Sequence, residues 1–284
     1  MRIVNQVEEL KTIIRQVKRE GKTIGFVPTM GYLHEGHLTL MRQAKAEQDF
    51  VVASIFVNPL QFGPNEDFAV YPRDLERDSR LAESTGVDIL FAPTVEEMYP
   101  EGHGNMLTSV DVSVITDGLC GASRPGHFRG VTTVVSKLFN IVEPDSAYFG
   151  QKDAQQVAVI KRMVKDLNMN LAIIAVPIVR ESDGLALSSR NVFLSDEERK
   201  AALVLNQSLQ LAGNMLAAGC RNAADIRTAM ADLISKEPLA AAEYVAIMGA
   251  DDLQEIDTVA APLLIAIAVR IGKTRLIDNM VWEG

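Results

Sequence analysis

Short apolar runs alternate with segments of helical periodicity from residue 23 to residue 176. The apolar runs, which we predict to be strands, are residues 23–27, 50–57, 89–92, 106–112, 146–149 and 171–176. Predicted helices lie between them at about 36–48, 72–85, 131–143 and 154–167. Strands that are apolar throughout and joined by helices are typical of a parallel sheet covered on both faces. The alternation therefore predicts a doubly wound α/β domain.

The segment before the first of these strands has the pattern of a helix start. Apolar residues recur at helical spacing from Val7 to Val17, and Asn5 followed by Glu8 is typical of a capping box. We therefore expect a helix to open the chain.

The pattern changes after Pro177. A polar stretch at 180–191 precedes Ala-rich helical segments at 195–218 and 223–236, and Ser195 with Glu198 repeats the capping-box pattern. Strands are predicted at 244–248, 263–270 and 274–279, the last two paired through a turn at 271–273. We expect an α/β domain over 1–178 and a smaller α+β cap domain with an antiparallel sheet over 179–284.

Composition excludes several classes of protein. With 284 residues the chain is long enough for two domains, and its net charge of -9 disfavours a general nucleic-acid binder. Cys120 and Cys220 are too few for a disulfide framework and favour a reducing cytoplasm. The start of the chain does not resemble a signal peptide, and the apolar run at 259–269 contains Pro262 and is too short to span a bilayer. We expect a cytoplasmic protein without nucleic-acid or membrane partners.

Two histidines follow the first strand, in the sequence PTMGYLHEGH that ends with His34, Glu35, Gly36 and His37. A helix start presents unpaired backbone N–H groups and a positive dipole end, and imidazoles can add donors to the same anion. Gly31 shapes the turn, and Gly36 permits a phosphate to approach. The alternative is that both histidines only cap the helix. Because ligands of open α/β sheets bind where strands end, we favour phosphate binding.

A zinc site is a weaker interpretation of the same motif. His34 and His37 are three residues apart, whereas helical zinc proteases place their histidines four apart beside a glutamate. His103 and His127 lie in Gly-rich loops without a cysteine partner. We therefore expect no protein-held metal.

A second candidate segment follows the strand at 146–149. Gly150 gives room, and the Lys152 ammonium suits a phosphate. Asp153 can accept from ribose hydroxyls or cap the next helix. Gln156 lies one helical turn beyond Lys152, where its amide could bond a small polar substrate.

Two more segments carry polar groups suited to binding. Asn58 and Gln61, after the strand at 50–57, can orient hydroxyls and a carboxylate, although Asn58 before Pro59 also suits a turn. Two hydroxyls and a guanidinium at 188–190 can bind terminal phosphates through hydrogen bonds and charge. The alternative is that this segment is only a polar linker. The Gly-rich segment 118–130 adds cations, but could equally serve a turn or a subunit contact.

Taken together, the segments 28–37, 56–62, 124–130, 148–153 and 187–190 resemble the pantothenate synthetase (pantoate–β-alanine ligase) family over nearly the whole chain. The histidine motif alone is similar to the wider superfamily of nucleotidylyltransferases and class I aminoacyl-tRNA synthetases. Segment 188–190 resembles the second phosphate-binding loop of that superfamily. The blocks 58–62 and 148–153 narrow the resemblance to this family.

The resemblance implies a Rossmann-like fold and an ATP-dependent condensation of pantoate with β-alanine through a pantoyl-adenylate, releasing pyrophosphate and then AMP. It also implies Mg²⁺ carried with the ATP phosphates, and a homodimer. One alternative is a superfamily relative that transfers a nucleotide to a phosphorylated small molecule. Another is a nucleotide-binding regulatory module without turnover.

The resemblance also implies roles for individual residues. The implied catalytic residues are His34, His37 and Lys152. The implied ATP-binding residues are Met30, Gly31, His34, Gly36, His37, Gly150, Gln151, Lys152, Asp153, Val179, Leu187, Ser188, Ser189 and Arg190. The implied binding residues for pantoate and β-alanine are Asn58, Gln61 and Gln156.

Overall fold

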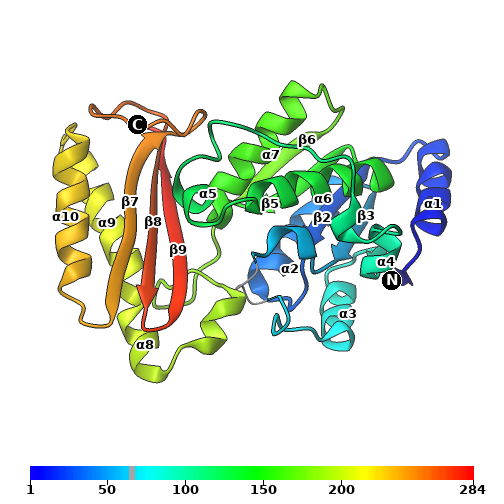
Figure 1. The fold of residues 1–284 in the computed structure, drawn as a ribbon, viewed down its shortest axis with the longest axis horizontal. Helices are drawn as coiled ribbons and strands as arrows, with labels where there is room; N and C mark the ends of the chain where they lie inside the picture. Colours follow the sequence, from blue (N-terminus) through cyan, green and yellow to red (C-terminus); the bar gives the residue numbers. More distant parts are fainter. Residues whose placement is uncertain (64–67) are drawn as a thin grey trace. The chain divides into compact units, whose positions relative to one another are not determined.

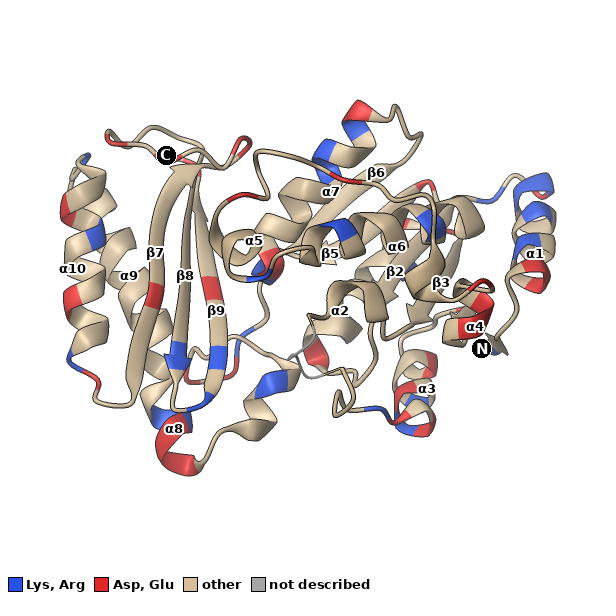
Figure 2. Cartoon of the chain, in the orientation of Figure 1, with Lys and Arg blue, Asp and Glu red and all other residues tan. Residues whose placement is uncertain are grey.

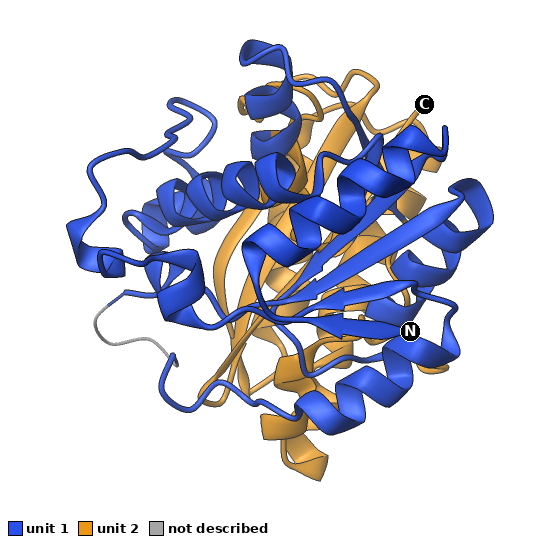
Figure 3. Ribbon diagram, turned by 90° about the vertical axis from the view of Figure 1, so that its right-hand side faces the viewer, with its two compact units in different colours: residues 1–151, 159–176 blue, residues 152–158, 177–284 orange. Residues whose placement is uncertain are grey.

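The computed structural model describes residues 1–63 and 68–284 (Figure 1). Its backbone contacts divide the chain into two compact units, coloured separately in Figure 3. The first unit comprises residues 1–151 and 159–176, and the second comprises 152–158 and 177–284. Residues 152–158 thus group with the second unit although they precede the predicted boundary at 178/179, which stays a prediction.

The first unit contains a six-stranded sheet in the order β1-β4-β3-β2-β5-β6. All its strand pairs are parallel. The strands are β1 (Arg2–Val4), β2 (Ile24–Thr29), β3 (Phe50–Ile55), β4 (Ile89–Phe91), β5 (Ser146–Gly150) and β6 (Ala172–Val176). The predicted doubly wound parallel sheet is therefore confirmed.

Helices connect these strands. They are α1 (Val7–Arg19), α2 (Glu35–Glu47), α3 (Leu75–Ser84), α4 (Val95–Met98), α5 (Leu119–Ser123), α6 (His127–Val142) and α7 (Ala154–Asp166). Short 3₁₀ turns are η1 (Pro59–Gln61), η2 (His103–Asn105) and η3 (Gln151–Asp153). Helices α1 and α6 contact each other, as do α2 and α3. Right-handed crossovers place the two pairs on opposite faces of the sheet, because β1-to-β2 and β2-to-β3 run in opposite directions across it.

The sheet determines where a ligand site can form. Its strand order reverses at β2, which has β3 on one side and β5 on the other. The apolar interior beside these strands includes the fully buried Val27, Met41 and Tyr148. Ligands of open α/β sheets bind at the carboxyl ends of strands at such a reversal. The residues after Thr29 and Gly150 therefore occupy the expected position.

The second unit contains a three-stranded antiparallel sheet, β7 (Ala240–Gly249), β8 (Leu263–Ile271) and β9 (Thr274–Trp282). Its helices are η4 (Ser189–Phe193), α8 (Asp196–Ala201), α9 (Leu203–Ala217) and α10 (Ala223–Ser235). Helix α9 contacts β8 and β9, and α10 contacts β7. The predicted hairpin is confirmed, since Ile271 pairs with Thr274. The Ser195–Glu198 capping box is confirmed as well.

Three local predictions are wrong. Strand β1 opens the chain, and α1 begins after Gln6 without a side-chain cap, so Asn5 and Glu8 form no capping box. Residues 106–112 form no strand, because the N–H and C=O of Val110 bond to threonine hydroxyls of α6 rather than to a ladder. The predicted helix at 195–218 is two helices that meet at Ala202.

Charged residues of both signs lie on several helices, among them α1, α3 and α8 (Figure 2). Helix α1, for example, has Glu8 and Glu9 in its first turn and Lys18 and Arg19 in its last, which complements the helix dipole. Within residues 1–63 and 68–284, no helix is both long and apolar enough to cross a membrane.

Candidate active site

His34 and His37 cap the start of α2 through their ring nitrogens. The Gly36 N–H donates to His34 Nδ1 at 3.2 Å, and the His34 N–H donates to His37 Nδ1 at 3.3 Å. The two rings stack with centroids 4.1 Å apart. A neutral imidazole that accepts at Nδ1 carries its proton on Nε2. The two histidines therefore do cap the helix, as the alternative interpretation expected. Capping does not exclude binding of an anion, because it leaves each ring with an N–H donor at Nε2.

The structure gives a steric reason for Gly36 in addition to the one that the sequence indicated. A Cβ at this position would lie 2.9 Å from Cε1 and Nδ1 of His34. That separation is too short for a side chain, so Gly36 makes room for the capping imidazole itself. Room for a phosphate at Gly36 stays a prediction.

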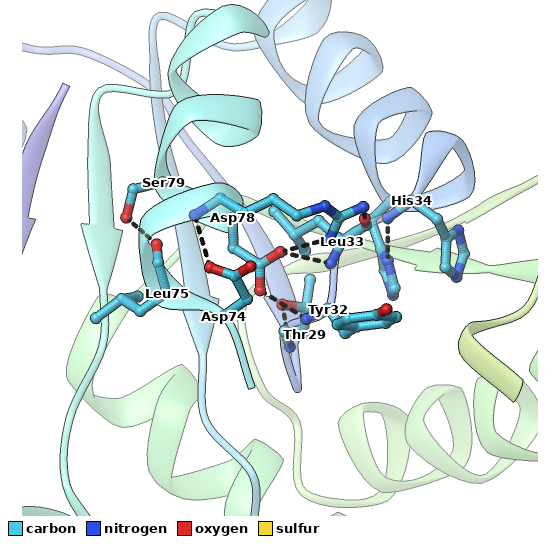
Figure 4. Close-up of polar contacts among 11 residues, drawn as sticks. Thr29, Tyr32, Leu33, His34, Asp74, Leu75, Asp78 and Ser79 are labelled. Carbon is cyan, nitrogen blue, oxygen red and sulfur yellow. Dashed lines mark hydrogen bonds and ion pairs between the residues drawn. The ribbon is translucent and has the colours of Figure 1, made fainter. Parts of the chain in front are cut away.

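The turn before His34 is held by Asp78 of α3 (Figure 4). The carboxylate accepts from the Tyr32 N–H at 2.6 Å and from the Leu33 N–H at 2.8 Å. Tyr32 has a φ of 49°, an unfavourable value for a tyrosine that these bonds stabilise. A Cβ on Gly31 would lie 2.9 Å from Ile55 Cγ2, so the turn packs closely against β3.

Asp78 is 1% exposed, and burial raises the pKa of its carboxyl above the usual range, against the effect of the two backbone bonds and of Arg77. Arg77 donates to the Leu33 carbonyl at 2.9 Å, and its guanidinium lies 5.1 Å from the centre of the Tyr32 ring. Helix α3 thus contacts both the N–H and the C=O groups of the turn that leads to His34.

The substitution Asp78→Asn tests whether the bonds from Asp78 to this turn matter for activity. An amide has one acceptor oxygen, so one backbone N–H would face an NH₂ group, at a cost of about 1–3 kcal/mol in the free energy of unfolding. Because displacement of a positioned group by about 1 Å can cost about a hundredfold, the activity that the sequence resemblance implies, followed as pantoate-dependent ATP–pyrophosphate exchange, should fall at least about tenfold. Thermal denaturation and exchange kinetics measure the two effects. Unchanged exchange in a destabilised variant would mean that Asp78 serves stability alone.

Gln61 is the buried end of the η1 turn that follows β3. Its Nε2 donates to Met30 Sδ at 3.0 Å, which joins this segment to the histidine segment after β2. Its Oε1 accepts from Asn58 Nδ2 at 3.2 Å. The structure therefore brings together Met30, Asn58 and Gln61, three of the residues predicted for the site.

Asn58 is 1% exposed and its amide is fully engaged. Besides Gln61, its Nδ2 donates to the Gly130 carbonyl at 3.1 Å, and its Oδ1 accepts from the Tyr99 hydroxyl at 2.7 Å and from the Leu60 N–H at 3.3 Å. Burial raises the pKa of Tyr99, so the phenol stays a donor. These contacts make Asn58 a residue that orients Gln61.

The Gly-rich segment 118–130, whose last residues form the start of α6, braces the same turn. His127 Nδ1 lies 2.8 Å from the Gln61 carbonyl oxygen, and Arg124 Nη2 donates to that oxygen at 3.3 Å. A Cβ on Gly130 would overlap the Leu60 carbonyl and lie 2.7 Å from the Gln61 nitrogen. The sequence analysis left open whether this segment supplies cations, serves a turn or makes a subunit contact. These contacts support a role in a turn, namely η1.

The other predicted residues lie at the end of β5 and in the second unit. Gly150 ends β5, and Gln151, Lys152 and Asp153 form η3. Val179 and Leu187 pair across a short hairpin, with the Leu187 N–H donating to the Val179 carbonyl at 3.0 Å. Ser188 caps η4, its Oγ accepting from the Arg190 N–H at 3.2 Å. Ser189 begins η4, and Gln156 is half-buried on α7.

Two buried carboxylates with structural partners near the candidate site residues escaped the sequence analysis. Asp78 stands one turn before the buried Ala82 on an amphipathic helix, and Asp278 alternates with Leu276 on a buried strand. A charged residue at an apolar position was the available signal in both cases. Among the described residues, no three His, Cys, Asp or Glu side chains group in a way that could hold a metal ion.

Comparisons with known proteins identify the family of the chain. A family model described as pantoate-beta-alanine ligase matches residues 2–281. The chain is 63% identical to a pantothenate synthetase of Heliobacterium modesticaldum and 59% identical to one of Acetivibrio thermocellus, each over 283 residues and 100% of both chains.

Solved structures give the same result. The pantothenate synthetase of Thermus thermophilus matches with a TM-score of 0.93 and 48% identity, over 99% of each chain. A pantoate-beta-alanine ligase from Francisella tularensis, described as complexed with beta-gamma ATP and beta-alanine, matches with a TM-score of 0.79 and 36% identity, over 99% of this chain and 97% of that one. The chain therefore belongs to the pantoate–β-alanine ligase family.

Proposed function

We propose that the chain condenses pantoate with β-alanine at the expense of ATP, through a pantoyl-adenylate. Membership of the family makes it a ligase that forms a C–N bond. The observation that carries the proposed mechanism is the histidine pair at the start of α2, whose rings are fixed as Nε2–H donors at the strand-order reversal. Such donors suit the charge that develops when a phosphate is attacked.

The first proposed step is attack of a pantoate carboxylate oxygen on the α-phosphate of ATP, which breaks the bond to the departing pyrophosphate. The second is attack of the β-alanine amine on the acyl carbon, which expels AMP. Adenylation gives the carboxylate a leaving group without an enzyme nucleophile, so neither cysteine is needed. Catalysis then consists of positioning and of stabilising negative charge.

Individual roles follow from the chemistry of each side chain. We assign His34, His37 and Lys152 to the charge on the phosphates during adenylation. Ser188, Ser189 and Arg190 are assigned to the β- and γ-phosphates. The remaining proposed ATP contacts are Met30, Gly31, Gly36, Gly150, Gln151, Asp153, Val179 and Leu187.

The amides are assigned to the other substrates. Gln61 and Gln156 are proposed to orient pantoate, and Gln61 also to contact the incoming amine. Because both halves of the Asn58 amide are engaged, we narrow its role to holding Gln61 in place.

Mg²⁺ is proposed to arrive with ATP. A Mg²⁺ ion of this kind would be ligated by phosphate oxygens and water. Such a cation neutralises charge on the phosphates. We further propose that the chain acts in the cytoplasm as a homodimer, with residues 1–178 binding ATP and pantoate and 179–284 serving as the cap.

One assay tests the reaction. We expect AMP release to require ATP, pantoate and β-alanine together, whereas exchange of pyrophosphate into ATP should require pantoate alone. Lys152→Ala should lower that exchange about a hundredfold, the effect typical of removing one such stabilising group, while thermal stability stays near that of the parent. Near-parental exchange in this variant would overturn the role of Lys152.

The alternatives give different results in the same assay. A nucleotidyl transferase acting on a phosphorylated substrate would release no AMP with a carboxylate and an amine. A regulatory module would bind ATP in calorimetry but release no pyrophosphate when pantoate is added.

A further inference from the structure

We propose that Asp278 and Asn279, neighbours on β9, are positioning residues that hold the two phosphate-binding segments of the second unit. The inference rests on the proposed function, which assigns Lys152 and residues 188–190 to the ATP phosphates. Asp278 and Asn279 act on these segments through the hairpin at 179–187 and through the Lys152 backbone, and neither is assigned a substrate contact.

Asp278 binds Arg180 in a fork. Its Oδ2 accepts from Arg180 Nη1 at 2.7 Å and its Oδ1 from Nη2 at 2.9 Å. Oδ1 also accepts from the Asn279 N–H at 2.8 Å, and the residue is 2% exposed. Two parallel charge-assisted bonds fix the direction of the guanidinium as well as its distance. Arg180 is thus held rigidly against β9.

Arg180 in turn fixes the hairpin that leads to Ser188. Its Nη1 donates to the Gly184 carbonyl at 3.1 Å, and the Glu181 N–H donates to the Leu185 carbonyl at 2.8 Å. A Cβ on Gly184, whose φ is 96°, would overlap the Asn206 amide of α9, so the tip of the hairpin packs closely. The hairpin therefore gives Ser188 a fixed starting point.

Asn279 holds the other segment. Its Nδ2 donates to the Lys152 carbonyl at 2.9 Å, and the residue is 3% exposed. Successive side chains of a strand point to opposite faces of the sheet. Asp278 alternates with Leu276, which belongs to the apolar core under α9 and α10, and Asn279 lies on the other face. One strand thus anchors Lys152 on one face and the hairpin on the other.

Strand β9 is well suited to this task. It pairs with β8 without a break from Leu263–Trp282 to Ile271–Thr274, so its backbone is hydrogen-bonded along its length. Cations that stabilise a transition state are effective only when they are held in fixed positions, and displacement by about 1 Å can cost about a hundredfold in rate. Because the two segments are anchored to adjacent residues of β9, the Lys152 backbone and the hairpin keep a fixed distance and orientation to each other.

The test compares the two half-reactions. We expect Asp278→Asn and Asn279→Ala to lower kcat for pantoate-dependent ATP–pyrophosphate exchange about tenfold to a hundredfold, with little change in the KM for pantoate. For Asp278→Asn, purified pantoyl-adenylate should still react with β-alanine at close to the parental rate, because that step does not involve the β- and γ-phosphates. A general structural defect would slow both half-reactions alike.

Glu243→Gln is the matched control. It removes ion pairs to Arg270 and Arg275, both at 2.7 Å, from the same sheet, and these bonds of Glu243 reach neither segment, so exchange should stay at the parental rate. If Asp278→Asn fails to fold, Arg180→Lys keeps the charge, loses the fork and should show the same split between half-reactions.

The outcomes separate this inference from the proposed function. If Lys152→Ala and Arg190→Ala lose exchange while the Asp278, Asn279 and Arg180 variants retain it, the positioning inference is wrong and the proposed function stands. If Lys152→Ala and Arg190→Ala themselves retain exchange, the proposed phosphate contacts are wrong. Equal slowing of both half-reactions in Asp278→Asn would also overturn the inference.

Discussion

His34→Asn is expected to lower pantoate-dependent ATP–pyrophosphate exchange by about a hundredfold to a thousandfold without lowering the melting temperature. An asparagine oxygen can accept the Gly36 N–H as Nδ1 does, and asparagine is among the most favourable residues at a helix N-cap. The substitution removes the Nε2–H donor, and loss of one donor to a developing charge costs about that much. Exchange kinetics and thermal denaturation of the same preparation measure both quantities.

Companion variants separate capping from catalysis. His34→Ala removes the cap and the donor together, so it should show the same kinetic loss plus destabilisation by about 1 kcal/mol. His37→Gln keeps a side chain that can complete the capping box at the third helical position. Should His34→Asn exchange pyrophosphate at the parental rate, the histidine would only cap α2.

Gly130→Ala is expected to lower kcat/KM for pantoate more than about a hundredfold. The added Cβ would overlap the Leu60 carbonyl and lie 2.7 Å from the Gln61 nitrogen, so the η1 turn has to move away from α6. A shift of about 1 Å in a positioned group is enough for an effect of that size. Steady-state kinetics with pantoate as the varied substrate measure it.

The helix propensities of glycine and alanine do not account for this expected loss of activity. In a helix interior, alanine is more favourable than glycine by about 1 kcal/mol, so propensity alone would stabilise α6. Gly104→Ala is the control, because a Cβ there meets nothing within 4 Å. Unaltered pantoate kinetics in Gly130→Ala would show that the position of Gln61 does not limit the reaction.

The sequence predicts those parts of the fold that local pattern determines. Strands β2 to β6 of the parallel sheet and the β8–β9 hairpin follow from apolar runs and a short turn. Strand β1 was missed because its three residues gain their order from pairing with β4, more than eighty residues away. The run at 106–112 is apolar enough for a strand, but its partners are side chains of α6.

The candidate site likewise has parts that local sequence pattern predicts and parts that depend on distant residues. Helix-start and strand-end rules located the histidine pair, Gln61 and the 150–153 segment. They did not find Asp78, because its bonds to Tyr32 and Leu33 join segments that are about 45 residues apart. The role of Asn58 also depended on distant partners, Tyr99 and Gly130, which no local pattern indicates.

The reciprocal bonds of His34 and His37 have a consequence for how the two residues can change. Each imidazole helps to orient the backbone that carries the other, so they constitute one thermodynamic unit rather than two separable donors. Free-energy changes of directly interacting residues are not additive. Loss of either ring therefore removes part of what the other contributes. A substitution at one of the two positions is not compensated by the histidine that remains at the other.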